Sequence, residues 1–189
     1  MKFLPLVLLT AVLSPALALA QDRVRGEIFA GYSLEHISPC GSQGSSPCGL
    51  ELGVLPPTMS FNGWNASITG YLYPFLGLTA DVSGHYGSSV PNSFSRYSYL
   101  FGPTVALRVR KFKPFAHALF GAASESATVN SGLSYEKYAR AVGGGLDIAV
   151  SRHFAVRVAQ FDYEWVNVPA YGAPSVNGLR YSGGVVFKF

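Results

Sequence analysis

The clearest pattern in the chain is an alternation of apolar and polar residues. Within 96–110, for example, Tyr97 and Phe101 fall on one face, and Ser98 and Thr104 fall on the other. A period of two is typical of a β-strand with one apolar face. Segments with this pattern occur at 25–37, 59–73, 76–86, 96–110, 114–127, 138–150, 153–165 and 177–189. The sequence therefore predicts an all-β chain of eight strands.

The connections between these segments alternate in length. The segment 38–57 is long and rich in Gly, Ser and Pro, whereas Pro74 and the pair Ser151-Arg152 leave room only for tight turns. Polar loops are also expected at 87–95, 128–137 and 166–176, with another short turn at 111–113. Transmembrane β-barrels have short periplasmic turns, long extracellular loops and an even number of strands. The order of connections therefore predicts an eight-stranded antiparallel transmembrane β-barrel.

Composition favours the membrane barrel over a soluble one. Hydrophobic residues make up 49% of the chain and charged residues 13%, yet beyond the N-terminal segment no apolar run reaches a dozen residues. A lipocalin-type soluble barrel would point its apolar face inward and keep its outer face polar. Tyrosines near the strand ends are typical of interfacial girdles. They are Tyr32, Tyr71, Tyr73, Tyr97, Tyr99 and Tyr181.

Charged residues fall on the face opposite the apolar one. The predicted lumen network comprises Glu27, Asp81, Arg108, Asp147, Arg157 and Arg180, with Lys188 at its end. Eight strands enclose a space that side chains fill, so charges there must pair. We expect Asp147 to form a salt bridge with Arg157 or Arg108 and the network to block free passage. The formal charge of +4 is not clustered, and no nucleic-acid partner is expected.

Residues 1–20 have the features of a cleaved signal peptide. Lys2 precedes an apolar run at 3–13, and Ala18-Leu19-Ala20 offers small residues at the cleavage site. Residues 21–189 then form the outer-membrane β-barrel domain. In an exported chain, the closely spaced Cys40 and Cys48 predict one disulfide in the first loop rather than a metal site.

Candidate catalytic residues are few. Some small barrels modify lipid A, which requires a nucleophilic Ser or an acid–base His at the outer rim. The pairs to consider are His85 with Ser88 and His117 with Ser124. Neither pair has the Ser–His–acid spacing of such enzymes, so the sequence predicts no enzyme, no cofactor and no metal. The lipid-modifying enzyme and a narrow pore remain the alternatives.

The seventh strand changes phase along its length. Arg157 is at an odd position, whereas Gln160, Asp162 and Glu164 are at even ones. Either a β-bulge shifts the alternation, or the last three residues rise above the bilayer. For the two acids, a solvated position at the rim is the simpler expectation, and Asp162→Ala would then have little effect.

The C-terminal strand resembles a known assembly signal. Tyr181, Val185, Phe187 and Phe189 alternate up to a terminal phenylalanine, as in the signal read by the outer-membrane barrel assembly machinery. With 27–32, 143–147 and 153–157, this pattern resembles the outer-membrane β-barrel family typified by the transmembrane domain of outer membrane protein A. The resemblance implies a monomer in the bacterial outer membrane, in contact with lipid and lipopolysaccharide. It also implies an envelope-stabilising or surface-interaction role.

Deletion of Phe189 tests the assembly signal. Because this residue closes the alternating aromatic set, we expect its loss to impair barrel assembly far more than export. Membrane fractionation combined with the heat-modifiable gel shift of folded barrels measures both. Folded barrel at the wild-type level in the deletion variant would contradict this prediction.

Overall fold

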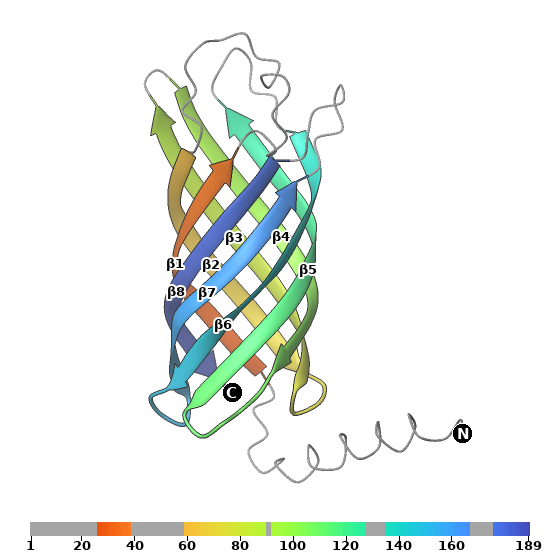
Figure 1. Ribbon diagram of the computed structural model, residues 1–189, viewed down its shortest axis with the longest axis vertical. Coiled ribbons are helices and arrows are strands. Elements are labelled where there is room, and N and C mark those ends of the chain that lie inside the picture. The colour runs from red at the N-terminus through yellow and green to blue at the C-terminus, as the bar shows by residue number, and fades with distance from the viewer. Residues whose placement is uncertain (1–25, 39–58, 90–91, 128–134, 167–175) are drawn as a thin grey trace, which may run out of the picture.

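The computed structural model describes residues 26–38, 59–89, 92–127, 135–166 and 176–189. Eight antiparallel strands form one closed barrel, in which each strand pairs with its neighbours in sequence and β1 pairs with β8 (Figure 1). The strands are β1 (Gly26–Ser38), β2 (Met59–Tyr71), β3 (Leu76–Ser89), β4 (Asn92–Ala106), β5 (Phe112–Ala127), β6 (Tyr135–Ala149), β7 (Phe154–Val166) and β8 (Val176–Lys188). The prediction of an eight-stranded antiparallel barrel is confirmed.

The outer wall of the barrel is apolar, because alternate side chains of every strand point away from the lumen. On β4, Tyr99 and Phe101 are exposed, whereas Ser98, Leu100 and Thr104 are buried. Many large apolar residues elsewhere on the wall are exposed in the same way. Water does not solvate such a surface favourably, and lipid does. Among the described residues, no helix is long and apolar enough to cross a membrane.

One end of the barrel carries three short turns at 72–75, 107–111 and 150–153. Both ends of the closing pair, Gly26 and Phe189, lie there too and exchange backbone hydrogen bonds of 3.0 Å. We call this the turn end. In the turn 107–111, Val109 and Phe112 hydrogen-bond to each other at 2.9 Å in both directions. This tight hairpin ends β4 at Ala106, four residues before the end predicted from sequence.

The predicted loop at 87–95 is wrong. Pairing between β3 and β4 continues through Ser88↔Ser93 to Ser89↔Asn92, so that most of this segment is strand. Its Gly and Ser content indicates a loop, but each strand supplies the other with backbone partners, and these stabilise the extended hairpin. The barrel wall is therefore longer here than the composition predicts.

A β-bulge in β7 explains its change of phase. Arg157 pairs with Gly184 and Gln160 pairs with Ser182, so β7 contains one residue more than β8 over the same interval. The pairing with β6 shifts at the same place. An extra residue reverses the alternation, and both Arg157 and Gln160 consequently point inward.

The interior is divided into a polar and an apolar sector. The apolar sector lies on β4 to β7 and consists of Leu100, Leu119, Ala123, Ala139, Ala141 and Val166. On β5, the polar His117 and the apolar Leu119 are both buried inside. The lumen is therefore only partly filled by charge, in contrast to the predicted polar filling.

Two glycines test how tightly the wall and the interior are packed. A Cβ on Gly143 of β6 would collide with the Phe161 carbonyl oxygen and with Asp162, whereas a Cβ on Gly70 of β2 would meet nothing within 4 Å. We expect Gly143→Ala to lower the free energy of unfolding by about 1–3 kcal/mol. Urea unfolding in lipid vesicles measures this. Gly70→Ala is the matched control, and equal losses in the two variants would contradict the packing described here.

Candidate functional site

Inside the lumen, an arginine is held between two aromatic rings. The guanidinium carbon of Arg157 lies 4.2 Å from the ring centre of Phe29 and 4.3 Å from that of Phe115. Phe29 is on β1 and Phe115 on β5, four strands away around the ring of eight. We call these three side chains the Phe–Arg–Phe stack. It crosses the lumen from wall to wall, and each cation–π contact stabilises this arrangement.

One carboxylate, that of Asp147, holds the same arginine from the side. Arg157 Nε donates to Asp147 Oδ1 at 2.7 Å, and Nη2 donates to Oδ2 at 3.2 Å. Lys113 Nζ lies 2.9 Å from Asp147 Oδ2 and also forms a salt bridge with Glu27. The lower part of the lumen, toward the turn end, is thus a compact group of paired charges.

A second group of charges is centred on Arg180. This side chain is fully buried and lies 3.0 Å from Asp81, 2.8 Å from Asp162 and 3.0 Å from Glu164. Gln160 joins the two groups, because it accepts from Arg157 at 2.6 Å and donates to Asp162 at 2.6 Å. The charges therefore form one continuous network along the lumen.

The far end of the network contains a Ser–His–Glu arrangement. His85 Nε2 lies 2.9 Å from Ser33 Oγ, and His85 Nδ1 lies 3.3 Å from Glu35. The order matches nucleophile, base and acid, and sequence reasoning missed it. Ser33, however, is fully buried and is also within hydrogen-bond distance of Ser182, while Arg96 forms a 2.7 Å salt bridge with Glu35. The arrangement is built to satisfy buried polar groups rather than to meet a substrate.

The charges inside are nearly balanced. Among the described residues, six buried carboxylates face four buried cations. Arg108 contributes a further cation near Glu27, and His117 Nε2 lies 2.6 Å from Asp162. Pairing of this kind is required inside a barrel, because removing one partner leaves a buried charge uncompensated.

Four predicted positions are corrected by the structure. Arg108 lies beyond the end of β4, partly exposed, where it donates to the Pro74 carbonyl oxygen at 2.7 Å and does not reach Asp147. Asp162 and Glu164 are buried in the lumen rather than solvated at the rim, because the bulge turns them inward. Tyr71, expected in the girdle, instead donates to Glu27 at 3.1 Å inside the barrel.

Other predicted residues fall in several places. Lys188 reaches the Ser151 carbonyl oxygen at 3.1 Å at the turn end. Side chains at alternate positions of the last strand point outward. The exposed ones include Tyr181, Val185, Phe187 and Phe189. Cys40 and Cys48, like residues 1–20, lie outside the described residues, so the disulfide and the signal peptide stay predictions.

Sequence reasoning missed several members of the network. Phe29 and Phe115 could not be recognised as lumen residues from the sequence, because an apolar residue at a lumen position breaks the expected alternation. Lys113 was assigned to a turn, although the hairpin places it on β5. Glu35 and Arg96 occupy strand positions that alternate with the apolar outer face, and this alternation was the signal that could have assigned them to the lumen.

The candidate catalytic pairs are not brought together. His117 points into the lumen toward Asp162, whereas Ser124, seven residues along the same strand, has the opposite parity. The side chain of Ser88 lies outside the described residues, and His85 contacts Ser33 instead. In the described part of the chain, no group of three or more His, Cys, Asp or Glu residues could hold a metal ion.

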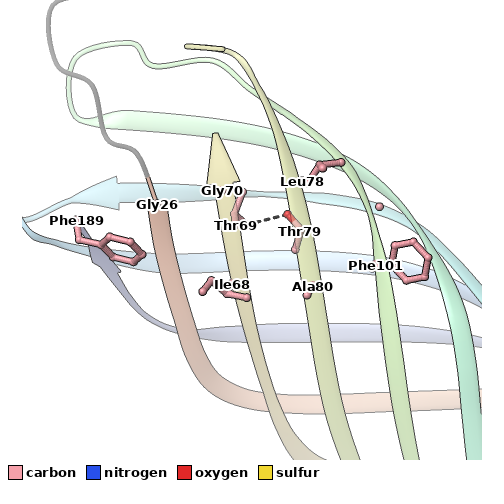
Figure 2. A pocket seen from close by; sticks show the side chains of 10 residues that line it. Gly26, Ile68, Thr69, Gly70, Leu78, Thr79, Ala80, Phe101 and Phe189 are labelled. Carbon is pink, nitrogen blue, oxygen red and sulfur yellow. Dashed lines mark hydrogen bonds between the residues drawn. The ribbon is translucent and has the colours of Figure 1, made fainter. Parts of the chain in front are cut away.

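A shallow groove of about 390 Å³ lies on the outer wall near the turn end. Figure 2 shows the apolar side chains of Ile68, Leu78 and Phe101 along it, with Phe189 at its edge. Thr69 and Thr79 also line it, but their hydroxyls hydrogen-bond to each other at 2.8 Å. The lining of this groove is therefore apolar apart from the two paired threonines.

A closed eight-stranded barrel with an apolar wall and a paired polar lumen defines the class of outer-membrane β-barrels. Solved structures of this class have the same fold. Neisserial surface protein A matches with a TM-score of 0.67 at 16% identity, covering 87% of this chain and 97% of that one. Ail, the attachment invasion locus protein of Yersinia pestis, matches with a TM-score of 0.56 at 18% identity, covering 87% and 97%.

The N-terminal β-barrel domain of OprF from Pseudomonas aeruginosa also matches, with a TM-score of 0.54 at 10% identity, covering 87% and 98%. No protein-family model matches the sequence, and no curated protein matches it either. The resemblance predicted from sequence is thus confirmed at the level of the fold.

Asp162 gives a test of the lumen network. Because Arg180, His117 and Gln160 all depend on this carboxylate, we expect Asp162→Ala to lower the free energy of unfolding by about 3–5 kcal/mol. Asp147→Ala should cost a similar amount. Urea unfolding in zwitterionic lipid measures both. The control is Arg152→Ala in an exposed turn, expected within about 0.5 kcal/mol of wild type, and an Asp162→Ala result as small as the control would refute the network.

Proposed function

We propose that this chain is an integral outer-membrane barrel with an envelope-stabilising or surface-interaction role and a lumen that is closed to solutes. The observation that carries the proposal is the Phe–Arg–Phe stack within its salt-bridged surroundings. A conducting pore needs a continuous water-filled path. Here the guanidinium of Arg157 occupies the space between opposite walls, and its position is fixed by Asp147 and Gln160.

The packing of the interior supports a structural role. Side chains of an eight-stranded barrel essentially fill the space it encloses. The paired charges on one sector and the apolar cluster on the other join strands that are not neighbours in the sheet, for example β1 to β5 through Lys113 and Glu27. Such cross-links add to the ladder hydrogen bonds and stiffen the barrel.

The surface-interaction part of the proposal rests on the fold and on the predicted loops. Two proteins of the same fold are named as a surface protein and an attachment invasion locus protein. The segments predicted as long extracellular loops are 38–57, 128–137 and 166–176. The first of these segments is rich in Gly, Ser and Pro, a composition that suits a surface-exposed loop.

A narrow pore is the second candidate. The network runs without a break from Glu27 at the turn end to Glu35 at the opposite end. A chain of exchangeable polar partners could pass protons or small ions if the Phe–Arg–Phe stack opened. Conductance therefore separates the two candidates.

In a planar bilayer we expect the wild-type barrel to give no steady channel. The triple variant Phe29→Ala, Phe115→Ala, Arg157→Ala should give clear single-channel steps, because it removes the stack. Phe101→Ala with Phe120→Ala, two exposed aromatics on the outer wall, is the matched control and should stay closed.

Folding of each variant is checked by its heat-modifiable gel shift before the conductance is recorded. If the triple variant does not fold, Arg157→Met, which keeps much of the side-chain volume but loses the charge, replaces it. Steady wild-type conductance would favour the pore. Lipid A mass analysis of cells with and without the protein tests the remaining alternative, a lipid-modifying enzyme.

A further inference from the structure

The turn end carries a one-sided group of exposed cations. Arg110 and Lys111 are exposed in the turn 107–111, and Arg152 is exposed in the turn 150–153. Neither turn contains an acidic residue, and the third turn, 72–75, has no charge at all. Within the described part of the chain, none of these three side chains has an ion pair with a carboxylate. We call Arg110, Lys111 and Arg152 the basic patch.

The two turns of the basic patch are held side by side. The amide of Ala149 at the end of β6 donates to the carbonyl oxygen of Lys111 at 2.7 Å. The turn 150–153 is closed in its own right by hydrogen bonds from Val150 and Ser151 to the Phe154 carbonyl oxygen. Figure 1 shows both turns next to each other at the lower end of the barrel. The backbone thus presents the cations from a fixed platform.

Arg110 holds an unfavourable backbone conformation. Its φ is 55°, and no other non-glycine residue in the described segments has a positive φ. Glycine or asparagine is favoured at such a hairpin position, because a Cβ there costs about 1–2 kcal/mol. Backbone strain of this kind is typically retained at functional positions. The side chain of Arg110 is therefore present at a cost to the fold, which points to a use for its charge.

Apolar residues next to the cations set their depth. Leu107, Val109 and Phe112 are exposed in one hairpin, and Val150 and Phe154 are exposed in the other. Side chains such as these lie among lipid chains, whereas guanidinium and ammonium groups lie at the headgroups. The alternation of the two kinds within a few residues places the basic patch at the level of the lipid phosphates and not out in the aqueous periplasm.

We propose that the basic patch binds the phosphate groups of anionic phospholipids in the periplasmic leaflet. The inference rests on the proposed outer-membrane location. Arginine forks and the lysine ammonium match phosphate oxygens, and each cation near an anionic surface contributes attraction that salt screens. The patch would fix the depth of the barrel and concentrate anionic lipid on one side of it.

The test uses the full mature barrel folded in detergent micelles. Short-chain phosphatidylglycerol and phosphatidylcholine are titrated separately, and amide NMR shifts in the turns 107–111 and 150–153 report binding. We expect tighter binding of phosphatidylglycerol, and a loss of about fivefold in affinity for each cation removed by Arg110→Gly, Lys111→Gln or Arg152→Gln. The preference should shrink as salt is added.

Arg110→Gly separates binding from folding. Since glycine relieves the positive φ, this variant should unfold no more easily than wild type while it binds phosphatidylglycerol more weakly. The control is Arg140→Gln, which removes an exposed cation of β6 that stacks on Trp165, away from the turns.

Three results would overturn the proposal. The first is equal affinity of the wild-type barrel for the two lipids. The second is an unchanged preference for phosphatidylglycerol in a variant in which Arg110, Lys111 and Arg152 are all replaced. The third is preferential binding of soluble peptidoglycan fragments over phosphatidylglycerol. A heat-modifiable, membrane-inserted barrel in any of these cases leaves the proposed function standing. Failure to insert into membranes would instead count against the proposed function itself.

Discussion

The narrowness of the lumen is the constraint on which the rest of the structure depends. Eight strands enclose only enough space for side chains, so every group that points inward must pack or pair with a group from another strand. Arg157 meets both demands at once, since Phe29 and Phe115 cover the two faces of its guanidinium while Asp147 and Gln160 hold its edge. The cross-linking of opposite walls follows from this geometry, and the proposed closure of the barrel to solutes rests on it.

The single extra residue in β7 makes the upper part of the network possible. Without the bulge, Asp162 and Glu164 would point to the lipid side, and Asp81 would be the one carboxylate left of the three that Arg180 contacts. A carboxylate in lipid and an underpaired arginine in the lumen would both be costly. The bulge therefore stabilises the barrel, although locally it interrupts the ladder of hydrogen bonds.

The fold was predictable from the sequence because each strand faces lipid on one side, and lipid imposes a regular alternation that can be counted. The inward side was harder to predict. Phe29 and Phe115 are apolar at lumen positions, and only the packing around Arg157 explains them. The end of β4 could not be predicted because the hairpin that ends this strand has Arg110 at a positive φ, where arginine is not a typical turn residue. The inward position of Asp162 depends on the bulge in β7, and the alternation of the sequence alone does not establish that a bulge is present.

The long β3–β6 side of the barrel has a consequence for how the molecule meets its surroundings. The strands β3, β4, β5 and β6 contain 14, 15, 16 and 15 residues, and the ladder between β3 and β4 continues to Asn92. About 9–11 residues suffice to cross the hydrocarbon region. A tilted strand advances roughly 2.5 Å per residue along the barrel axis, so the residues beyond those needed for crossing add about 10 Å to the height of this side. In the proposed outer-membrane location, a large molecule approaching from outside would therefore meet stiff, hydrogen-bonded sheet on this side of the barrel.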